Sequence, residues 1–314
     1  DRPGESRRKS TVSLPSSREI LHVIPRNFTV DSQDGIADPA GMSGVRLEVE
    51  THIVTGSTTS LKNLSKCVSE VGAEIDSLVF AGISSAESVL TNTEKELGVI
   101  LVDIGGGTTS IIIFIEGSPC YSSVLPIGAK NVTSDLAIGL RLSLDSAEKL
   151  KIALSKTDKG ENKEDEIDLG KLGIYEETKT VSQKTIVEGI IKPRLSEIFD
   201  MVAQEVSKNG FAGLTPSGVV LSGGGALTIG ATETCRRVLS LPCRVGIPTG
   251  VKGLVEEILD PSFASSIGLL LSAVKNKVSS GNTKVFPNFG EITGKVPLKG
   301  IAGKISSFIK SFLP

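Results

Sequence analysis

The amino-acid sequence predicts an α/β fold. Apolar runs rich in β-branched residues end in glycine turns, and segments of helical character alternate with them along the chain. With 314 residues the chain is long enough to bury two modest hydrophobic cores, so two lobes are expected.

Composition excludes several classes of function. The chain carries 34 basic and 36 acidic residues, so no large basic face is available and nucleic acid is not an expected partner. No apolar run approaches the roughly 20 residues that span a bilayer, and no secretion signal is present. Cysteines and histidines are scattered without ligand spacing, which predicts reduced thiols in a cytoplasmic protein and no zinc site.

The first part of the chain is predicted to form antiparallel strands after a disordered leader at 1–17. Because residue 1 is Asp rather than Met, we expect the chain to be a fragment. Two alternating runs, 19–31 and 45–56, flank a stretch rich in Gly and Pro, as antiparallel strands do. A helix at 60–71, a strand at 77–81 and a short helix at 86–90 are expected to follow.

The rest of the chain alternates between strands and helices. Strands are predicted at 99–102 and 111–115, and helices over 131–154 and 182–207, separated by a charged, solvated loop at 156–168. A third strand ends in a glycine turn at 222–226, and a helix is expected to begin near 261. Residues 276–299 are rich in Gly, Pro, Asn and Lys and are predicted to be a linker.

The first glycine turn joins two apolar strands, which predicts a hairpin rather than a strand-to-helix dinucleotide motif. Three glycines let backbone N–H groups approach an anion, and two threonines add hydroxyl donors: Gly105, Gly106, Gly107, Thr108 and Thr109. Asp103 at the strand end could hold Mg²⁺ through water. The alternative is an ordinary tight hairpin whose Asp caps its own turn.

A second glycine turn, comprising Gly223, Gly224, Gly225 and Ala226, follows an apolar strand and is expected to open a helix whose dipole faces a ligand. A tight structural turn is the alternative. Between the two turns, Glu148 and Lys151 share one face of a helix and could both reach ribose hydroxyls. Without that context the pair would be a surface salt bridge.

These residues resemble the actin-like ATPase superfamily, whose two related lobes close over ATP. The stretch from Asp103 to Thr109 is similar to its second phosphate motif, and 219–226 to its adenosine motif. Within the superfamily the closest resemblance is to the FtsA family of bacterial cell-division proteins, carried by 18–56, 127–151 and 261–271. The resemblance implies an actin-like (ribonuclease H-like) two-lobed fold, here amino-terminally truncated, with ATP and Mg²⁺ as cofactors.

The same resemblance implies a domain organisation. After the leader, the expected parts are a portion of the family's extra subdomain (18–58), the remainder of the first lobe (59–90), the nucleotide-binding core of the second lobe (91–125 and 209–260), its outer subdomain (126–208), an inter-lobe helix (261–275), the linker, and a C-terminal amphipathic helix (300–314). Two departures stand out: the family's first phosphate motif is missing, and Ala129 replaces a usual glycine.

The C-terminal segment predicts membrane binding on its own evidence. With helical spacing, five bulky apolar residues fall on one stripe flanked by lysines: Ile301, Ile305, Phe308, Ile309 and Phe312. The alternative is a helix packed on the protein's own core.

The resemblance implies a protein that polymerises with itself, anchors FtsZ filaments to phospholipid at the cytoplasmic face of the inner membrane, and recruits other division proteins to the septum. At most slow ATP hydrolysis is expected. The alternatives are a pilus-assembly actin-like scaffold and a small-molecule kinase or phosphatase of the same superfamily.

Overall fold

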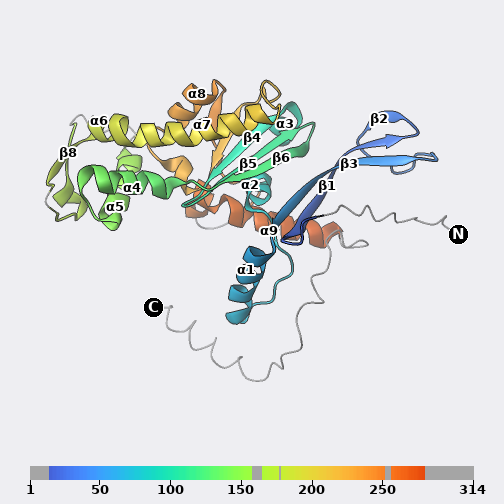
Figure 1. Cartoon of the computed structure of the whole chain (residues 1–314), viewed down its shortest axis with the longest axis horizontal. Coiled ribbons are helices and arrows are strands. Elements are labelled where there is room, and N and C mark those ends of the chain that lie inside the picture. The colour runs from blue at the N-terminus through green and yellow to red at the C-terminus, as the bar shows by residue number, and fades with distance from the viewer. Residues whose placement is uncertain (1–13, 158–164, 177, 252–255, 280–314) are drawn as a thin grey trace.

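The computed structural model describes residues 14–157, 165–176, 178–251 and 256–279. A central sheet of five strands, in the order β10-β9-β4-β5-β6, forms the middle of the molecule (Figure 1). The strands are β4 (Val99–Ile104), β5 (Thr109–Ile115), β6 (Ser118–Leu125), β9 (Val219–Ser222) and β10 (Cys243–Val245). The three strands β4 to β6 form an antiparallel meander, while β9 runs parallel to both β4 and β10.

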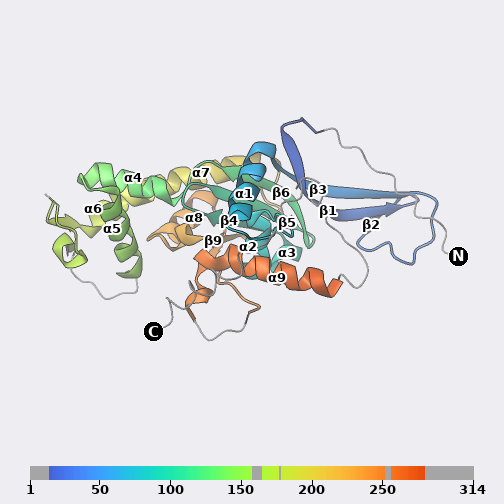
Figure 2. The same ribbon diagram turned by 90° about the horizontal axis from the view of Figure 1, so that it is seen from below.

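Helices cover both faces of this sheet. One face packs against α2 (Ala81–Val89) and α9 (Ala264–Ser279), which Figure 2 shows crossing the sheet. The other face shares one hydrophobic core with α7 (Lys192–Lys208) and α8 (Ala231–Leu239). Helices α4 (Ala129–Leu140) and α5 (Leu144–Thr157) continue this core beyond the end of the sheet (Figure 1). Leu101 faces the first pair and Val102 the second group, as strand alternation requires.

Shorter elements complete the described residues. They are α3 (Asn92–Leu97), β7 (Glu166–Asp168), η1 (Leu169–Leu172), β8 (Thr180–Ser182), α6 (Gln183–Ile186), the π-helical turn Val187–Ile191, η3 (Gly224–Leu227), η4 (Glu256–Leu259) and η5 (Pro261–Phe263).

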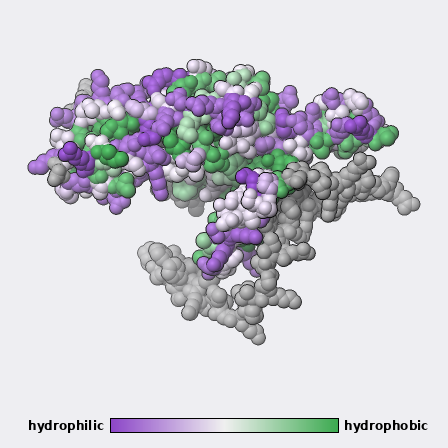
Figure 3. All heavy atoms as spheres, in the orientation of Figure 1, coloured by the Kyte–Doolittle hydropathy of each residue, from purple (hydrophilic) through white to green (hydrophobic). Residues whose placement is uncertain are grey.

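A separate antiparallel sheet extends from one end of the molecule. It consists of β1 (Arg18–Val30), β2 (Gln33–Ile36) and β3 (Leu47–Ser57), with β1 in the middle. Near its base, the Nε2 atom of His52 lies 3.0 Å from the Ser122 hydroxyl of β6. Beyond this base the apolar side chains are uncovered, with Val45 99% and Leu47 60% exposed. Apolar surface is visible at the tip of this sheet in Figure 3.

Helix α1 (Thr58–Glu70) continues directly from β3 and points away from the central sheet (Figure 1). None of its residues is buried. The Ser57 side chain caps its first turn by accepting from the Ser60 amide. Local capping therefore contributes to the stability of this helix, whereas packing against the described residues contributes little to it.

The structure confirms the antiparallel strands before residue 57 and the hairpin at 99–115. The strand predicted at 77–81 is wrong: this apolar stretch forms no ladder, and α2 already begins at Ala81, before the predicted residue 86. The segment 131–154 forms two helices, because Arg141 adopts a left-handed conformation with φ of 55°. Strand β6 was not predicted.

The predicted inter-lobe helix extends to Ser279 rather than ending at 275. Most of the predicted leader and linker, and the whole C-terminal segment that contains Ile301, Ile305, Phe308, Ile309 and Phe312, lie outside the described residues. Among the described helices, none combines the length and apolar character needed to cross a membrane.

Candidate functional site

The two glycine turns lie side by side at one edge of the central sheet. Strands β4 and β9 are parallel neighbours with Asp103 opposite Ser222, so the turns that follow them meet. A Cβ atom on Gly223 would lie 2.4 Å from the Asp103 Oδ1 atom, and one on Gly225 would lie 2.4 Å from Ile104 Cγ2. Gly223 also has a φ of +78°. Both positions therefore require glycine for this close contact.

A cavity of about 950 Å³ opens beside these turns, a volume within the range of small-molecule sites. Its walls come from both turns, from α4 and α5, and from η3 and the residue before η5. The lining residues are Gly105, Gly106, Ala129, Lys130, Thr133, Ser134, Leu144, Asp145, Glu148, Lys151, Ile152, Ser155, Lys156, Gly224, Gly225, Leu227, Thr228 and Asp260.

The first turn is fastened through its carbonyl groups. The Gly105 and Gly106 carbonyls accept from the amides of Ala129, at 2.9 Å, and Lys130, at 2.8 Å. These bonds use the first amides of α4, so the α4 N-terminus is not available to an anion. Within the described residues, the amides of Gly106 and Gly107 make no hydrogen bond, and both glycines are exposed. Two N–H donors thus remain available beside the cavity.

The other predicted residues of the first turn differ in position. Thr108 is exposed, whereas the buried Thr109 hydroxyl donates to the Ile127 carbonyl at 2.8 Å and has no proton left for a phosphate. The expected donor role of Thr109 is therefore corrected. Asp103 is not among the residues that line the cavity: its Oδ2 atom is turned to α2 and α9, while its Oδ1 atom lies beside Gly223 of the second turn.

The Asp103 carboxylate is held by two serine hydroxyls from these helices. Its Oδ2 atom accepts from Ser85 of α2 at 2.5 Å and from Ser265 of α9 at 3.3 Å. Burial raises the pKa of Asp103 above its ordinary value, and the two serine hydrogen bonds oppose that rise. No cluster of three or more His, Cys, Asp or Glu side chains suited to a metal occurs in the part of the chain that the structure describes.

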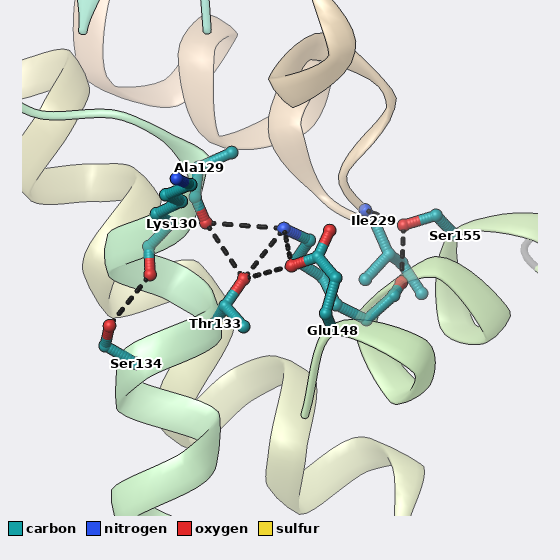
Figure 4. Close-up of polar contacts among 8 residues, drawn as sticks. Ala129, Lys130, Thr133, Ser134, Glu148, Ser155 and Ile229 are labelled. Atoms are coloured by element: carbon teal, nitrogen blue, oxygen red, sulfur yellow. Dashed lines mark hydrogen bonds and ion pairs between the residues drawn. The ribbon is translucent and has the colours of Figure 1, made fainter. Parts of the chain in front are cut away.

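Glu148 and Lys151 form part of a buried network rather than a surface salt bridge (Figure 4). Lys151 is only 7% exposed, and its ammonium group donates to the Ala129 carbonyl at 3.4 Å, the Thr133 hydroxyl at 2.9 Å and Glu148 Oε2 at 2.7 Å. The Thr133 hydroxyl also donates to the Glu148 carboxylate. Burial would raise the pKa of Glu148, but the hydrogen bonds from Lys151 and Thr133 outweigh it and lower that pKa.

The helix that the second turn opens is shorter than predicted. Residues Gly224–Leu227 form a single 3₁₀ turn, and α8 begins only at Ala231. The turn therefore opens a helix, as expected, but this helix is a single 3₁₀ turn, too short for the expected helix dipole to act on a ligand. Ala226 is buried, and its amide donates to the Gly223 carbonyl at 3.1 Å. Gly224 and Gly225 line the cavity, while Gly223 and Ala226 support them from behind.

Several lining residues were not predicted from the sequence. Lys130 and Lys156 are exposed cations on α4 and α5, and Asp260 caps η5 through the Ser262 amide at 2.9 Å. The Ser155 hydroxyl accepts from the Ile229 amide at 3.2 Å and so joins α5 to the segment after the second turn (Figure 4). Lys130 could have been predicted as a residue of the cavity, because it lies at the predicted helix start directly after the first hairpin.

The sheet order, with its two paired turns, defines the actin-like class of proteins. The structure of MreB5 from Spiroplasma citri bound to ADP is similar, with a TM-score of 0.58, 21% identity and coverage of 73% of this chain and 69% of that chain. A PilM-PilN type IV pilus biogenesis complex has a TM-score of 0.56, 17% identity and coverage of 84% and 68%. At these identities the likeness shows the fold alone.

Within this class, the chain belongs to the family of the cell division protein FtsA. The model of that family matches residues 100–268, and the model of the SHS2 domain inserted in FtsA matches 7–55. FtsA of Pseudomonas aeruginosa is 38% identical over 85% of this chain, and FtsA of Borreliella burgdorferi is 37% identical over 96%. The chain spans 64% and 70% of the lengths of these two relatives.

Proposed function

We propose that this chain is an ATP-binding, actin-like division protein whose two glycine turns hold one nucleotide. The observation that carries the proposal is the direct contact of the turns beside a single cavity, with the free Gly106 and Gly107 amides next to it. Such amides suit phosphate oxygens. The related fold of MreB5, described bound to ADP, gives independent support.

The network in Figure 4 suggests separate roles for its two charged residues. Lys151 is saturated by protein acceptors and therefore orients Glu148 rather than touching the nucleotide. Within the described residues, the Glu148 Oε1 atom takes no hydrogen bond, since the bonds from Thr133 and Lys151 both reach Oε2. We propose that Oε1 accepts from a ribose hydroxyl. The exposed ammonium group of Lys130 would meet the phosphates.

The Mg²⁺ that accompanies ATP would be held near Asp103. A magnesium ion bound with nucleotide keeps several waters and needs only one or two carboxylates besides the phosphates, so a single Asp set behind the first turn fits it through water. When bound, the ion would neutralise phosphate charge.

Nucleotide binding is tested by reversing one charge at the cavity. Lys130→Glu should weaken the affinity for a fluorescent ATP analogue by about tenfold or more, because a cation facing phosphate becomes an anion. Lys149→Glu is the matched control: Lys149 is exposed on the neighbouring helix α5 but does not line the cavity. Equal affinities for the two variants, or no binding by the unaltered chain, would contradict the proposal.

We further propose that the chain polymerises and ties FtsZ filaments to the membrane at the division septum, where it recruits later division proteins. Membership in the FtsA family and the amphipathic pattern of 300–314 support this. Five apolar side chains contribute roughly 10 kcal/mol of gross burial, and ordering about ten residues costs a similar amount. One such helix would bind weakly, whereas several on one filament would bind firmly.

The alternatives of a pilus-assembly scaffold and of a small-molecule kinase or phosphatase are less well supported. The chain is similar to curated FtsA proteins over most of its length, and the likeness to the PilM-PilN complex extends only to the fold.

A further inference from the structure

Helices α2 and α9 are joined by an unusually polar contact behind the two glycine turns. Their backbones touch, since a Cβ atom on Gly268 would lie 1.7 Å from the Ser84 carbonyl oxygen. The Ser84 hydroxyl donates to the Ser265 carbonyl at 2.6 Å, and the Ser88 hydroxyl donates to the Ala264 carbonyl at 2.8 Å. These two serines fasten helix to helix.

Ser85 and Ser265 do something different, because their hydroxyls turn towards the sheet. They lie 2.7 Å apart, and both reach the Oδ2 atom of Asp103. Among the described residues no lysine or arginine pairs with this carboxylate, and the two serine hydroxyls are the side chains that donate hydrogen bonds to it. Even a half-buried carboxylate, as Asp103 is, loses hydration that hydrogen bonds or a bound ion must replace.

The opposite oxygen of the same carboxylate faces the glycine turns. Asp103 Oδ1 lies 2.4 Å from the position that a Cβ atom on Gly223 would occupy, at the start of the second turn. Next to it, the buried Ser222 hydroxyl has no hydrogen-bond partner within the described residues. By strand alternation Ser222 lies on the same face of the sheet as Val220 and Asp103. The unpaired Ser222 hydroxyl therefore lies beside a carboxylate that has no cationic partner in the described part of the chain.

We propose that Ser85 and Ser265 are positioning residues that fix Oδ2 of Asp103 and thereby aim Oδ1 at the hydrated cation of a bound nucleotide. The proposal rests on the nucleotide-binding function proposed above. The serines come from α2 and α9, so they tie the carboxylate to both helices at once. Without either hydroxyl the Asp103 carboxylate is less firmly oriented. Its interaction with the bound cation should then be weaker.

The test measures the affinity of the whole chain for a fluorescent ATP analogue, once with Mg²⁺ and once with EDTA. Ser85→Ala and Ser265→Ala should reduce the affinity gained from Mg²⁺ about tenfold, the value of one hydrogen bond to a charged group, and leave the metal-free affinity unchanged. Ser265→Thr, which keeps the hydroxyl, should restore the gain. Ser84→Ala and Ser88→Ala are matched controls, because these buried hydroxyls of α2 do not touch Asp103.

The possible failures are distinguishable. If the unaltered chain binds no nucleotide, the proposed function falls and the inference with it. If the chain binds nucleotide but Mg²⁺ adds nothing, or if Ser85→Ala and Ser265→Ala behave like the two controls, only the inference is overturned. An equal loss of affinity with and without Mg²⁺, accompanied by a lower melting temperature, would assign the serines a structural role and would also overturn it.

Discussion

Lys151 shows why the identity of a side chain does not settle its role. From the sequence alone, Glu148 and Lys151 were compatible with a surface salt bridge, because helical spacing fixes their common face but not what covers it. The structure places Lys151 under α4, where Thr133 and the Ala129 carbonyl complete its hydrogen bonds. The pair therefore fixes α4 to α5 and, with it, one wall of the cavity.

Replacing this lysine should destabilise the protein. Lys151→Met keeps most of the side-chain volume but leaves the Glu148 carboxylate and the Ala129 carbonyl without their donor. Because the Glu148 side chain is 43% exposed, removing its buried partner costs less than breaking a fully buried ion pair, roughly 1–2 kcal/mol in the free energy of unfolding. Urea denaturation measures that value, and Lys149→Met on the exposed face of the same helix should change it by less than about 0.5 kcal/mol. Equal effects of both variants would contradict the network.

Other single residues of the site were predictable only in part. The glycines and Asp103 could be found because a triple glycine between two apolar strands is an unusual local pattern. Ser85 and Ser265 could not, since they lie 180 positions apart in the chain and meet only when α2 and α9 pack together. The prediction that the Thr109 hydroxyl donates to a phosphate was wrong for a related reason: a local pattern does not reveal that this hydroxyl donates to the Ile127 carbonyl.

Among the elements, the three-stranded sheet β1–β3 is attached to the rest of the molecule near two histidines, of which His22 is buried and His52 half-buried. The His22 Nε2 atom accepts from the Phe80 amide at 2.9 Å, and His52 meets Ser122 of β6. Burial lowers the pKa of His22, and the neighbouring His52 lowers it further. Burial, followed by the charge of Arg26, lowers the pKa of His52. Both rings are therefore held neutral in the folded chain.

This arrangement predicts a loss of stability in acid. Below the ordinary histidine pKa of about 6.5, the unfolded chain binds protons that the folded chain does not, so the free energy of unfolding falls as pH drops through the lowered values. Between pH 7.5 and pH 5.5 we expect a loss of roughly 1 kcal/mol or more from His22 and His52 together. Urea denaturation across this range measures it.

His22→Gln is the informative variant for that dependence, because its amide oxygen can still accept from Phe80 but cannot take up a proton. Its free energy of unfolding should decline less steeply with falling pH than that of the unaltered chain. A slope that is unchanged in the variant would exclude His22 as a source of the pH dependence.

The elements also show where pattern reading works. Long alternating or apolar runs, such as β1, β3 and β4, were predicted correctly because each run is long enough for its residue pattern to identify a strand. The short apolar run before α2 was read as a strand, although it has no neighbouring strand to pair with. Such pairing is decided by the tertiary structure and cannot be inferred from six or seven residues.

For the whole molecule, the actin-like fold was predictable because the two glycine turns, each after an apolar strand, resemble the phosphate and adenosine motifs of the actin-like superfamily. The sequence did not reveal which hydrogen bonds connect α9 and the residue directly before it to the site. The Gly223 amide donates to the Pro261 carbonyl at 3.1 Å, directly before α9, while Ser265 contacts Asp103. A nucleotide in the cavity would therefore act on α9 through both glycine turns.

If the proposed function holds, membrane attachment is expected of the assembled protein rather than of a single copy. Phe308→Glu removes one of the five apolar side chains of the predicted stripe, worth about 1.5–3 kcal/mol, and should strongly reduce flotation with anionic phosphatidylglycerol liposomes. Phe286→Glu, outside that stripe, is the matched control. Flotation of the unaltered chain should increase with ATP if assembly makes a weak anchor firm. Flotation that is indifferent to nucleotide would count against this coupling.

The most direct test of the account is a crystal structure of the chain grown with Mg²⁺ and a non-hydrolysable ATP analogue. We predict phosphate oxygens within hydrogen-bonding distance of the Gly106 and Gly107 amides, with the sugar beside Glu148 and the base against Gly224 and Gly225. A nucleotide bound elsewhere on the surface, or phosphates directed away from the first turn, would contradict the claim that the two turns form one site.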